Sequence, residues 1–299
     1  MKIIPIYYHL VSNKKNPLVE NLYSHKDIAT FRKDLEVLVK KYKILDLAQL
    51  KANKKGIVLT FDDGFAECYK VIFPILKELS LPAFFFVNND FIDNKAMFYR
   101  AKISLLISKL GYLSPFTHNQ LSYVLECKIT DLKGQLLAIN NGDTRKIDSL
   151  MTIAGIDIDN YLQEKQPYLT SEQISEMVNE GFYFGGHTHD HMRLQGMPAT
   201  EQEHRIIDST LDICDSFNLD YKLCSLPHND VGIKKEVFDK VSNKIDYLFG
   251  GYGLNHQPNL RYFQRISNEH SSLRIDRFIN TWKVFHYVSK NMRLKRKKS

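Results

Sequence analysis

Two adjacent carboxylates follow an uninterrupted apolar segment of the chain. Residues 56–61 (GIVLTF) read as a buried strand, and Asp62, Asp63 and Gly64 come directly after them. Two like charges at the end of a buried strand are unfavourable unless a cation compensates them. Because neighbouring side chains on a strand point in different directions, one aspartate can bind a metal while the other stands beside it as a base. An Asp-Asp-Gly sequence is also common in exposed turns, so this feature alone does not establish a site.

Three histidines stand within five residues, in the run His187-Thr188-His189-Asp190-His191 that follows a short apolar strand and two glycines. His187 and His191 are four residues apart, so on a helical turn they would project from one side, as two ligands of one metal must. One aspartate and two neutral imidazoles, with positions left open for water and substrate, are typical of a hydrolytic zinc site. Asp190 either orients a ligand histidine or is solvated, and Thr188 is expected to hydrogen-bond within the turn.

Two weaker candidates lie at the ends of other predicted strands. His9 ends the first strand and could line the same mouth of the sheet, although a half-buried structural role fits its position equally well. Pro227 and His228 follow a strand over residues 221–226 and could form a wall of the pocket or a turn. We therefore predict His9, Thr188, Pro227 and His228 as substrate-binding or site-lining residues.

The elements that must position these residues alternate between strands and helices. Apolar and β-branched runs predict strands over residues 2–9, 43–45, 56–61, 83–87, 182–186 and 221–226, and near Tyr247 and Tyr262. Helical patterns predict helices over residues 28–42, up to about Leu79 with a bend at Pro74, from Thr170, and over 201–217, 234–241 and 274–287. This alternation is typical of a parallel α/β sheet, in which active sites form at the carboxyl ends of the strands.

The strand signal fades between residues 95 and 167, where the sequence looks helical. This indicates an insertion rather than a separate domain. We therefore predict one catalytic domain over residues 1–289, which contains the insertion, and a basic tail over residues 290–299.

The charge of the chain is unevenly distributed. Its 299 residues carry a formal net charge of +7, but residues 290–299 hold six basic side chains and no acidic one, so the rest carries only +1. A uniformly basic nucleic-acid-binding domain is therefore disfavoured, and we expect no nucleic acid as a partner. The tail is compatible with peripheral contact to an anionic membrane or with a solubilising role.

The compartment can also be predicted from composition. The apolar segment at residues 3–10 is short and lacks a signal-peptide cleavage site, and no apolar run is long enough to span a membrane. Four widely spaced cysteines form no CxxC pair, which favours reduced thiols. These features predict a cytoplasmic protein, peripheral at the inner membrane face if the tail binds there.

The two motifs together resemble those of the polysaccharide deacetylase (NodB-homology, carbohydrate esterase family four) superfamily. Residues 60–64 (TFDDG) are similar to its first motif, and residues 187–191 (HTHDH) to its second, a His-Ser/Thr pair followed by any two residues and then His. The resemblance extends over residues 1–95 and 165–267. Members of this family fold as a distorted barrel of parallel strands with surrounding helices, so the resemblance implies an α/β barrel, with seven strands expected.

The resemblance also implies a role for each motif residue. Asp63, His187 and His191 would bind a divalent metal ion, expected to be Zn²⁺, and Asp62 would be the general base. The implied reaction removes an N-acetyl or other N-acyl group from an amino sugar during the biosynthesis of a cell-surface polysaccharide or glycoconjugate. In a cytoplasmic setting, the expected substrate is a lipid-linked or nucleotide-linked amino sugar.

The third motif of the family departs here from its usual pattern. Where many members have Arg-x-Pro-aromatic, residues 225–229 read SLPHN, so the arginine that would position the base is missing. The later motif that supplies a general-acid histidine has no clear match, which leaves His9, His228, His256 or solvent to protonate the leaving amine. Two alternatives therefore stay open: a degenerate member that binds carbohydrate without hydrolysis, and a hydrolase of non-peptide C–N bonds in a non-sugar substrate.

Overall fold

A sheet of eight parallel strands forms the centre of the computed structural model, which describes residues 3–140, 143–251 and 261–296, with side chains up to residue 285. The strand order is β7-β6-β5-β4-β3-β2-β1-β8. The strands are β1 (Ile3–Tyr8), β2 (Gly56–Phe61), β3 (Phe84–Val87), β4 (Tyr183–Gly186), β5 (Leu223–Ser225), β6 (Tyr247–Gly250), β7 (Tyr262–Gln264) and β8 (Ile266–Ser267). Their carboxyl ends therefore share one edge, where Asp62 and His187 stand.

Closure of the sheet depends on its last two strands. β7 pairs with β6, and β8 pairs with β1, at opposite ends of the strand order. Only Arg265 separates β7 from β8, so one stretch of chain joins the two ends and the sheet is nearly closed into a barrel. The predicted distorted α/β barrel is confirmed, with eight strands rather than seven because the closing strand is divided at Arg265.

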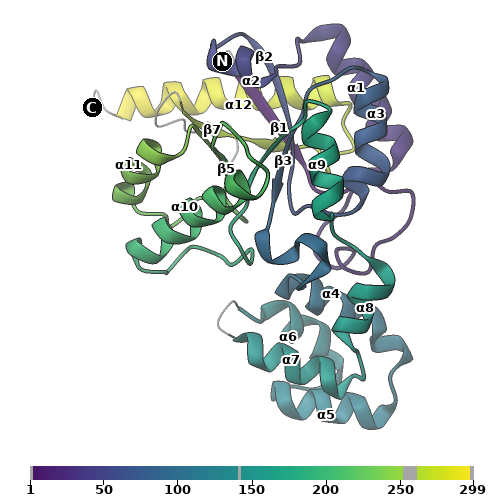
Figure 1. Ribbon diagram of the computed structural model, residues 1–299. Coiled ribbons are helices and arrows are strands. Elements are labelled where there is room, and N and C mark those ends of the chain that lie inside the picture. Colours follow the sequence, from purple (N-terminus) through teal and green to yellow (C-terminus); the bar gives the residue numbers. More distant parts are fainter. Residues whose placement is uncertain (1–2, 141–142, 252–260, 297–299) are drawn as a thin grey trace.

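Helices surround this barrel (Figure 1). Those outside the insertion are α1 (Ile28–Lys41), α2 (Leu47–Lys51), α3 (Phe73–Glu78), α9 (Ser171–Asn179), α10 (Ala199–Ser216), α11 (Lys235–Lys244) and α12 (Ile275–Arg296). The helix predicted from Thr170 is α9, and Thr170 forms the expected capping box with Gln173. α1 packs against α12, and α10 packs against β4 and α11.

Two local predictions change in the structure. The strand predicted at residues 43–45 is wrong, because the chain makes one bridge from Ile44 to Ile57 and then enters α2, which Asp46 caps. The helix predicted up to about Leu79 begins as a π-helical segment, Cys68–Ile72, that runs directly into α3. Pro74 itself stands in the first turn of α3, where its missing N–H group costs no helical hydrogen bond.

The insertion forms a helical layer on one side of the barrel, shown in teal in Figure 1. Its elements are η2 (Asn89–Asn94), α4 (Tyr99–Lys109), η3 (Leu110–Tyr112), α5 (Pro115–Leu125), η4 (Ile129–Asp131), α6 (Leu132–Ala138), α7 (Thr144–Ile153) and α8 (Ile158–Lys165). Buried side chains of α4 to α8, such as Leu105 and Leu121, form a core together with Leu10 and Phe65 from the loops of the barrel. Because η2 directly follows β3, the insertion covers the carboxyl edge of the sheet.

The strands place alternate side chains in different cores, as their geometry requires. Phe84 and Phe86 of β3 pack in one cluster with Phe249 and Phe263, whereas Phe85 packs with residues of the flanking helices in another. Apolar burial on both faces explains why these strands read as continuous hydrophobic runs.

The cysteines form no disulfide: Cys68, Cys127, Cys214 and Cys224 are all free. Among the residues that the structure describes, we find no helix with the length and apolar character needed to cross a membrane.

Candidate active site

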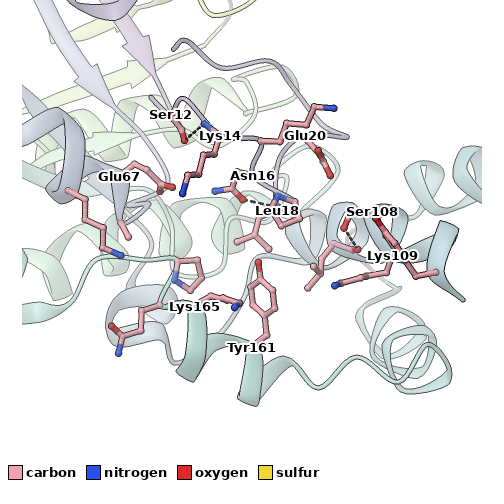
Figure 2. A pocket seen from close by; sticks show the side chains of 18 residues that line it. Ser12, Lys14, Asn16, Leu18, Glu20, Glu67, Ser108, Lys109, Tyr161 and Lys165 are labelled. Atoms are coloured by element: carbon pink, nitrogen blue, oxygen red, sulfur yellow. Dashed lines mark hydrogen bonds between the residues drawn. The ribbon is translucent and has the colours of Figure 1, made fainter. Parts of the chain in front are cut away.

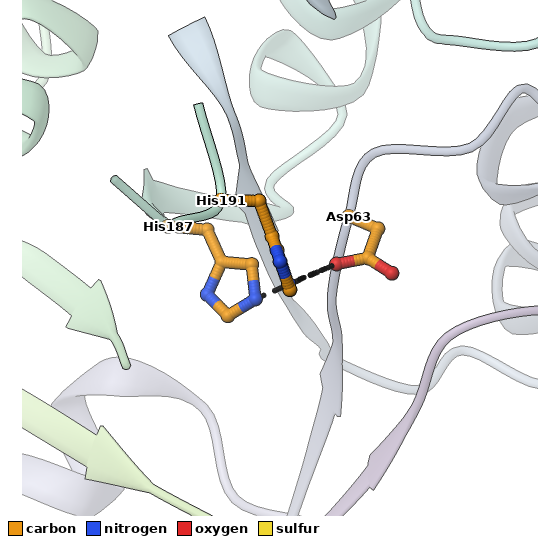
Figure 3. Close-up of side chains that lie close together, drawn as sticks. All are labelled: Asp63, His187 and His191. Atoms are coloured by element: carbon orange, nitrogen blue, oxygen red, sulfur yellow. Dashed lines mark ion pairs between the residues drawn. The ribbon is translucent and has the colours of Figure 1, made fainter. Parts of the chain in front are cut away.

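The predicted metal ligands assemble at the carboxyl ends of two strands. Asp63 follows β2, His187 follows β4 directly, and His191 lies further along the same loop (Figure 3). The Oδ1 atom of Asp63 lies 3.5 Å from Nε2 of His187 and 3.1 Å from Nε2 of His191. One ligand atom from each residue lies within 4.8 Å of the others, and all three side chains are buried. A single metal ion can bridge atoms at this spacing.

The two histidines come together on an irregular loop, not on the helical turn that their spacing predicts. Thr188 and His191 have positive φ angles of 63° and 57°. Such angles are uncommon outside glycine, and this kind of strain is concentrated at functional sites. Asn88 holds the loop, since its Nδ2 atom donates to the carbonyl oxygens of His187 at 2.6 Å and Thr188 at 3.0 Å. Backbone turns therefore aim both imidazoles at Asp63.

The chemistry of the three side chains fits a divalent ion such as zinc. Nδ1 of His187 donates to the carbonyl oxygen of Ser225 at 2.8 Å, which leaves Nε2 as the unprotonated nitrogen beside Asp63. Burial lowers the pKa of His191 and so favours its neutral form. Burial would raise the pKa of Asp63, but His191 and His187 hold it well below its ordinary value. The buried Oδ1 atom of this carboxylate accepts no hydrogen bond, as expected for an atom that takes a metal instead.

Asp62 stands beside this set and is held by a buried arginine. Arg265 donates from Nη1 to Oδ1 of Asp62 at 2.8 Å and from Nη2 to Oδ2 at 2.6 Å, a bidentate pair. Oδ2 of Asp62 also lies 3.9 Å from Nε2 of His187. Burial would raise the pKa of Asp62, but the charge of Arg265 and its hydrogen bonds to the carboxylate outweigh burial and lower the pKa. Asp62 is therefore an ionised carboxylate in a fixed orientation.

Arg265 comes from the break between β7 and β8, and sequence reasoning missed it. Its guanidinium also donates to the hydroxyl oxygens of Thr60 at 3.0 Å and Ser225 at 2.6 Å. Ser225 is the first residue of the unusual third motif, so the arginine absent from that motif is supplied in space by a later strand. The only signal that could have found it is a charged residue inside the strand predicted near Tyr262.

His9, directly after β1, forms a second charged pair with another residue that sequence reasoning missed. Its Nδ1 atom lies 2.7 Å from Oε2 of Glu269, and its backbone N–H donates to Oε1 at 2.7 Å. Burial alone would lower the pKa of His9, but Glu269, aided by Asp63 and Asp62, raises it to about 9. The ring packs against Tyr23, whose hydroxyl donates to Oδ2 of Asp63 at 3.4 Å. His9 is therefore protonated at neutral pH.

These groups line a cavity of about 200 Å³. It is lined by both aspartates, both ligand histidines, His9, Arg265 and His228. The insertion supplies Phe98 and Arg100 to the same cavity, so it forms part of the site. Two predicted lining residues, Thr188 and Pro227, are buried and do not face the cavity.

His228 differs sharply from His9 in its protonation. Its ring centroid lies 4.7 Å from that of His191 and 6.1 Å from that of Phe98. Burial, as the main cause, lowers the pKa of His228 to about 2. His228 is therefore neutral and is a poor proton donor, whereas His9 carries a proton. The third candidate acid, His256, lies outside the described residues.

The remaining residues of the second motif face away from the site. Both carboxylate oxygens of Asp190 lie 2.8 Å from Nη1 of Arg205, so Asp190 neither orients a ligand histidine nor stands alone in solvent. His189 lies 2.8 Å from a carboxylate oxygen of Asp212. His189 therefore pairs with a helix residue outside the ligand set.

Comparison with known sequences identifies the family. Residues 49–247 match the family described as polysaccharide deacetylase. This chain belongs to that family. The matched residues include both motifs but neither His9, Arg265 nor Glu269, which explains why these three are invisible to motif comparison. No curated protein sequence matches this chain significantly.

The barrel is shared with solved deacetylase structures. The Streptococcus pyogenes deacetylase PplD, in complex with acetate, has a TM-score of 0.61 at 16% identity, over 94% of this chain and 98% of that one. IcaB from Ammonifex degensii has a TM-score of 0.56 at 15% identity, over 89% and 91%. A de-N-acetylase from Aggregatibacter actinomycetemcomitans has a TM-score of 0.54 at 16% identity, over 92% and 98%. At such identities the likeness concerns the fold.

Proposed function

We propose that this polysaccharide deacetylase family member is a metal-dependent hydrolase that removes an N-acetyl or other N-acyl group from an amino sugar. The observation that carries the proposal is one buried cavity in which an Asp-His-His set adjoins a carboxylate clamped by Arg265. Family membership supports it. The S. pyogenes deacetylase of the same fold was solved with acetate, which is the product such a reaction releases.

The proposed metal ligands are Asp63, His187 and His191, and the proposed ion is Zn²⁺. A divalent ion held there would lower the pKa of a water molecule and polarise the acyl carbonyl group. Three protein ligands leave coordination positions open for water and substrate. Hydrogen bonds within the protein orient these ligands, since Ser225 fixes the tautomer of His187 and Asn88 fixes the loop.

Asp62 is the proposed general base. Its Oδ2 atom lies 3.9 Å from Nε2 of His187, so its carboxylate adjoins the ligand set. Arg265 keeps Asp62 ionised and in one orientation, which favours proton transfer from the attacking water. Arg265 also supports a catalytic site over a degenerate one, because it pairs with Asp62 and contacts Ser225 of the third motif.

His9 is the proposed general acid. When the amide C–N bond breaks, the leaving nitrogen needs a proton, and the imidazolium of His9 can supply it from Nε2 while Glu269 holds Nδ1. The proton taken from water passes to Asp62, and the remaining hydroxyl becomes part of the released carboxylic acid. His228 cannot fill this role, because its buried ring is neutral.

We also propose a lipid-linked or nucleotide-linked amino sugar as substrate, within cell-surface polysaccharide biosynthesis on the cytoplasmic side. The four free cysteines suit a reducing compartment. The basic tail at residues 290–299 suits peripheral contact with an anionic membrane.

Metal analysis combined with an acetate-release assay tests the proposal. Protein stripped with a chelator and reconstituted with Zn²⁺ should bind the ion stoichiometrically and release acetate from N-acetylglucosamine oligosaccharides. A double variant, His187→Ala with His191→Ala, should lose both properties. Asp62→Asn should retain the ion but lower kcat by about 10²–10⁴-fold. His189→Ala is the matched control, because this histidine of the same motif pairs with Asp212 and should be dispensable.

Three results would count against the proposal. Zinc retained by the double variant would contradict the site. Stoichiometric zinc without acetate release from a broad panel of sugars would favour a carbohydrate-binding protein. Amine release from non-sugar amides alone would favour a hydrolase of other C–N bonds.

A further inference from the structure

A second cavity lies between loops of the barrel and the insertion (Figure 2). Its volume is about 530 Å³. Three parts of the chain line it: residues 12–20 after β1, residues 66–70 after the first motif, and the ends of α4 and α8 with the residues that follow them. We call this cavity the lysine groove.

The lysine groove concentrates positive charge. It is lined by five lysines and two glutamates, a formal charge of +3, whereas the whole chain before residue 290 carries only +1. The lysines are Lys14, Lys15, Lys70, Lys109 and Lys165. Figure 2 shows the side chains of Lys14, Lys109 and Lys165 directed into the groove around Tyr161. Basic residues from separate segments thus lie together in the lysine groove, although residues 1–289 as a whole are nearly neutral.

These lysines are not taken up by ion pairs of the protein. Within the described part of the chain, only Lys165 among the five has a carboxylate oxygen within 4.0 Å, that of Glu164. Glu67 is half-buried, and burial raises its pKa while the charge of Lys70 opposes this rise. Solvated ammonium groups converging on one cavity can therefore exchange water for an anionic ligand.

The lysine groove and the active-site cavity are lined by different residues of the same two segments. The loop after β1 contributes residues 12–20 to the groove and then Leu22 and Tyr23 to the active site. Helix α4 carries Arg100 into the active site near its start and Lys109 into the groove at its end. Nine helical residues rise by about 14 Å, a span that an extended oligosaccharide can cover.

We propose that the lysine groove binds phosphate-ester groups of an anionic amino-sugar substrate while the acylated sugar occupies the active site. This inference rests on the proposed function and names its substrate class. Phosphate is the expected anion because it carries about −1.5 to −2 charges as a monoester, more than a carboxylate, and lysine binds it as a point charge. Tyr112, which is 87% exposed at the rim, adds an amphipathic ring for the glycan to contact.

Equilibrium binding tests this directly. The probes are a β-1,4-linked N-acetylglucosamine tetrasaccharide, the same tetrasaccharide with a phosphate monoester, and a version with a carboxylate. Binding is measured by calorimetry on zinc-loaded protein in the Asp62→Asn background, so that no probe is consumed. The groove variant replaces Lys14, Lys70 and Lys109 by Gln, and a charge-matched control replaces Lys33, Lys40 and Lys54, which are exposed and outside the groove.

The phosphorylated probe should bind about tenfold more tightly than the neutral one, equivalent to about 1.4 kcal/mol. The groove variant should lose this advantage, the control should keep it, and added salt should reduce it. Equal affinity for both probes, or an advantage that survives in the groove variant, would overturn the proposal. A carboxylated probe bound as tightly as the phosphorylated one would overturn the assignment to phosphate.

Two further measurements are needed. The first identifies the source of the phosphate, and the second tests the proposed function independently of the lysine groove. Vesicles with a lipid-diphosphate-linked N-acetylglucosamine are compared with vesicles of equal charge that lack the sugar. Groove-dependent capture of the first kind that is tighter than binding of the soluble phosphorylated probe would assign the phosphate to a lipid carrier. Acetate release from the neutral tetrasaccharide by the groove variant, at the wild-type kcat, shows the chemistry intact whatever the groove does. If wild-type protein releases no acetate, this result counts against the proposed deacetylase function and not against phosphate binding by the lysine groove.

Discussion

The active-site cavity at the mouth of the barrel and the lysine groove both contain several charged side chains, but these differ in burial and in pairing. At the mouth, Asp62 is paired with Arg265 and His9 with Glu269, and these partners lie deep in the protein. In the lysine groove, the ammonium groups are exposed and mostly without a nearby carboxylate. Buried charges depend on fixed partners, whereas exposed charges can change partners at little cost. We therefore expect the mouth to favour chemistry in one geometry and the lysine groove to favour reversible binding of an anion.

The largest expected effect follows from breaking the buried pair at the mouth. Arg265→Met keeps a long apolar side chain but leaves the carboxylate of Asp62 buried and unpaired. Removing one partner of a buried pair costs about 3–5 kcal/mol, and the same change should raise the pKa of Asp62 and lower activity. Urea unfolding of the zinc-free protein measures the stability loss without the metal contribution.

A matched exposed pair provides the control for this prediction. Arg32 lies 2.7 Å from Glu78 as a similar arginine–carboxylate pair, but both side chains are exposed. Arg32→Met should therefore have a much smaller effect on stability. Equal losses from the two substitutions would mean that the buried pair has no special role.

The next effect concerns the proton on His9. Glu269→Gln removes the charge that raises the pKa of His9 to about 9, so the pKa should fall toward its ordinary value near 6.5. At pH 8 the protonated fraction would then fall by up to about 30-fold, and kcat with it, while activity at pH 6 should be nearly retained. A pH profile of kcat measures this, and an unmoved alkaline limb would exclude His9 as the acid.

The same pair makes a pH-dependent contribution to stability. Because the folded-state pKa of His9 is raised above its unfolded value, the contribution is fully present below about pH 6.5 and is lost as pH rises through about 9. Thermal unfolding of wild-type protein should show this loss, and Glu269→Gln should not. NMR titration of the His9 ring gives the pKa independently of both.

The motif residues could be predicted from the sequence, whereas the residues that pair with them could not. Asp62, Asp63 and the two histidines stand in short motifs at strand ends, so local pattern places them correctly. Arg265 and Glu269 come from the closing stretch of the barrel, about 200 residues away from Asp62 and 260 from His9. Only the closure of β8 against β1 brings them to the site, and no local pattern encodes that contact.

Residue spacing can also mislead when the backbone is strained. A four-residue interval predicts a helical turn for His187 and His191, yet positive φ angles at Thr188 and His191 produce the same convergence from a loop. Threonine and histidine give no warning of such angles, whereas glycine would. The ligand set was therefore predictable, and the path of the chain between its members was not.

The backbone of the barrel is closely packed, and a substitution at one glycine tests this. A Cβ atom added at Gly185 of β4 would lie 2.3 Å from the carbonyl oxygen of Leu223 on β5. Gly185→Ala should therefore force the neighbouring strands apart and destabilise the protein by about 1–3 kcal/mol. Urea unfolding measures the change, and a neutral result would show that the strands can yield beside the ligand loop.

The insertion should respond to the same substitution with the opposite sign and the smallest effect. Gly134 lies in α6, and no neighbouring atom stands within 4 Å of the place its Cβ would occupy. Alanine is the better helix former by up to about 1 kcal/mol, so Gly134→Ala should stabilise the chain by about 0.5–1 kcal/mol and leave activity unchanged. Destabilisation by Gly134→Ala would mean that this face of α6 is covered in solution. The insertion would then share the tight packing of the barrel, and the contrast between the two regions would fail.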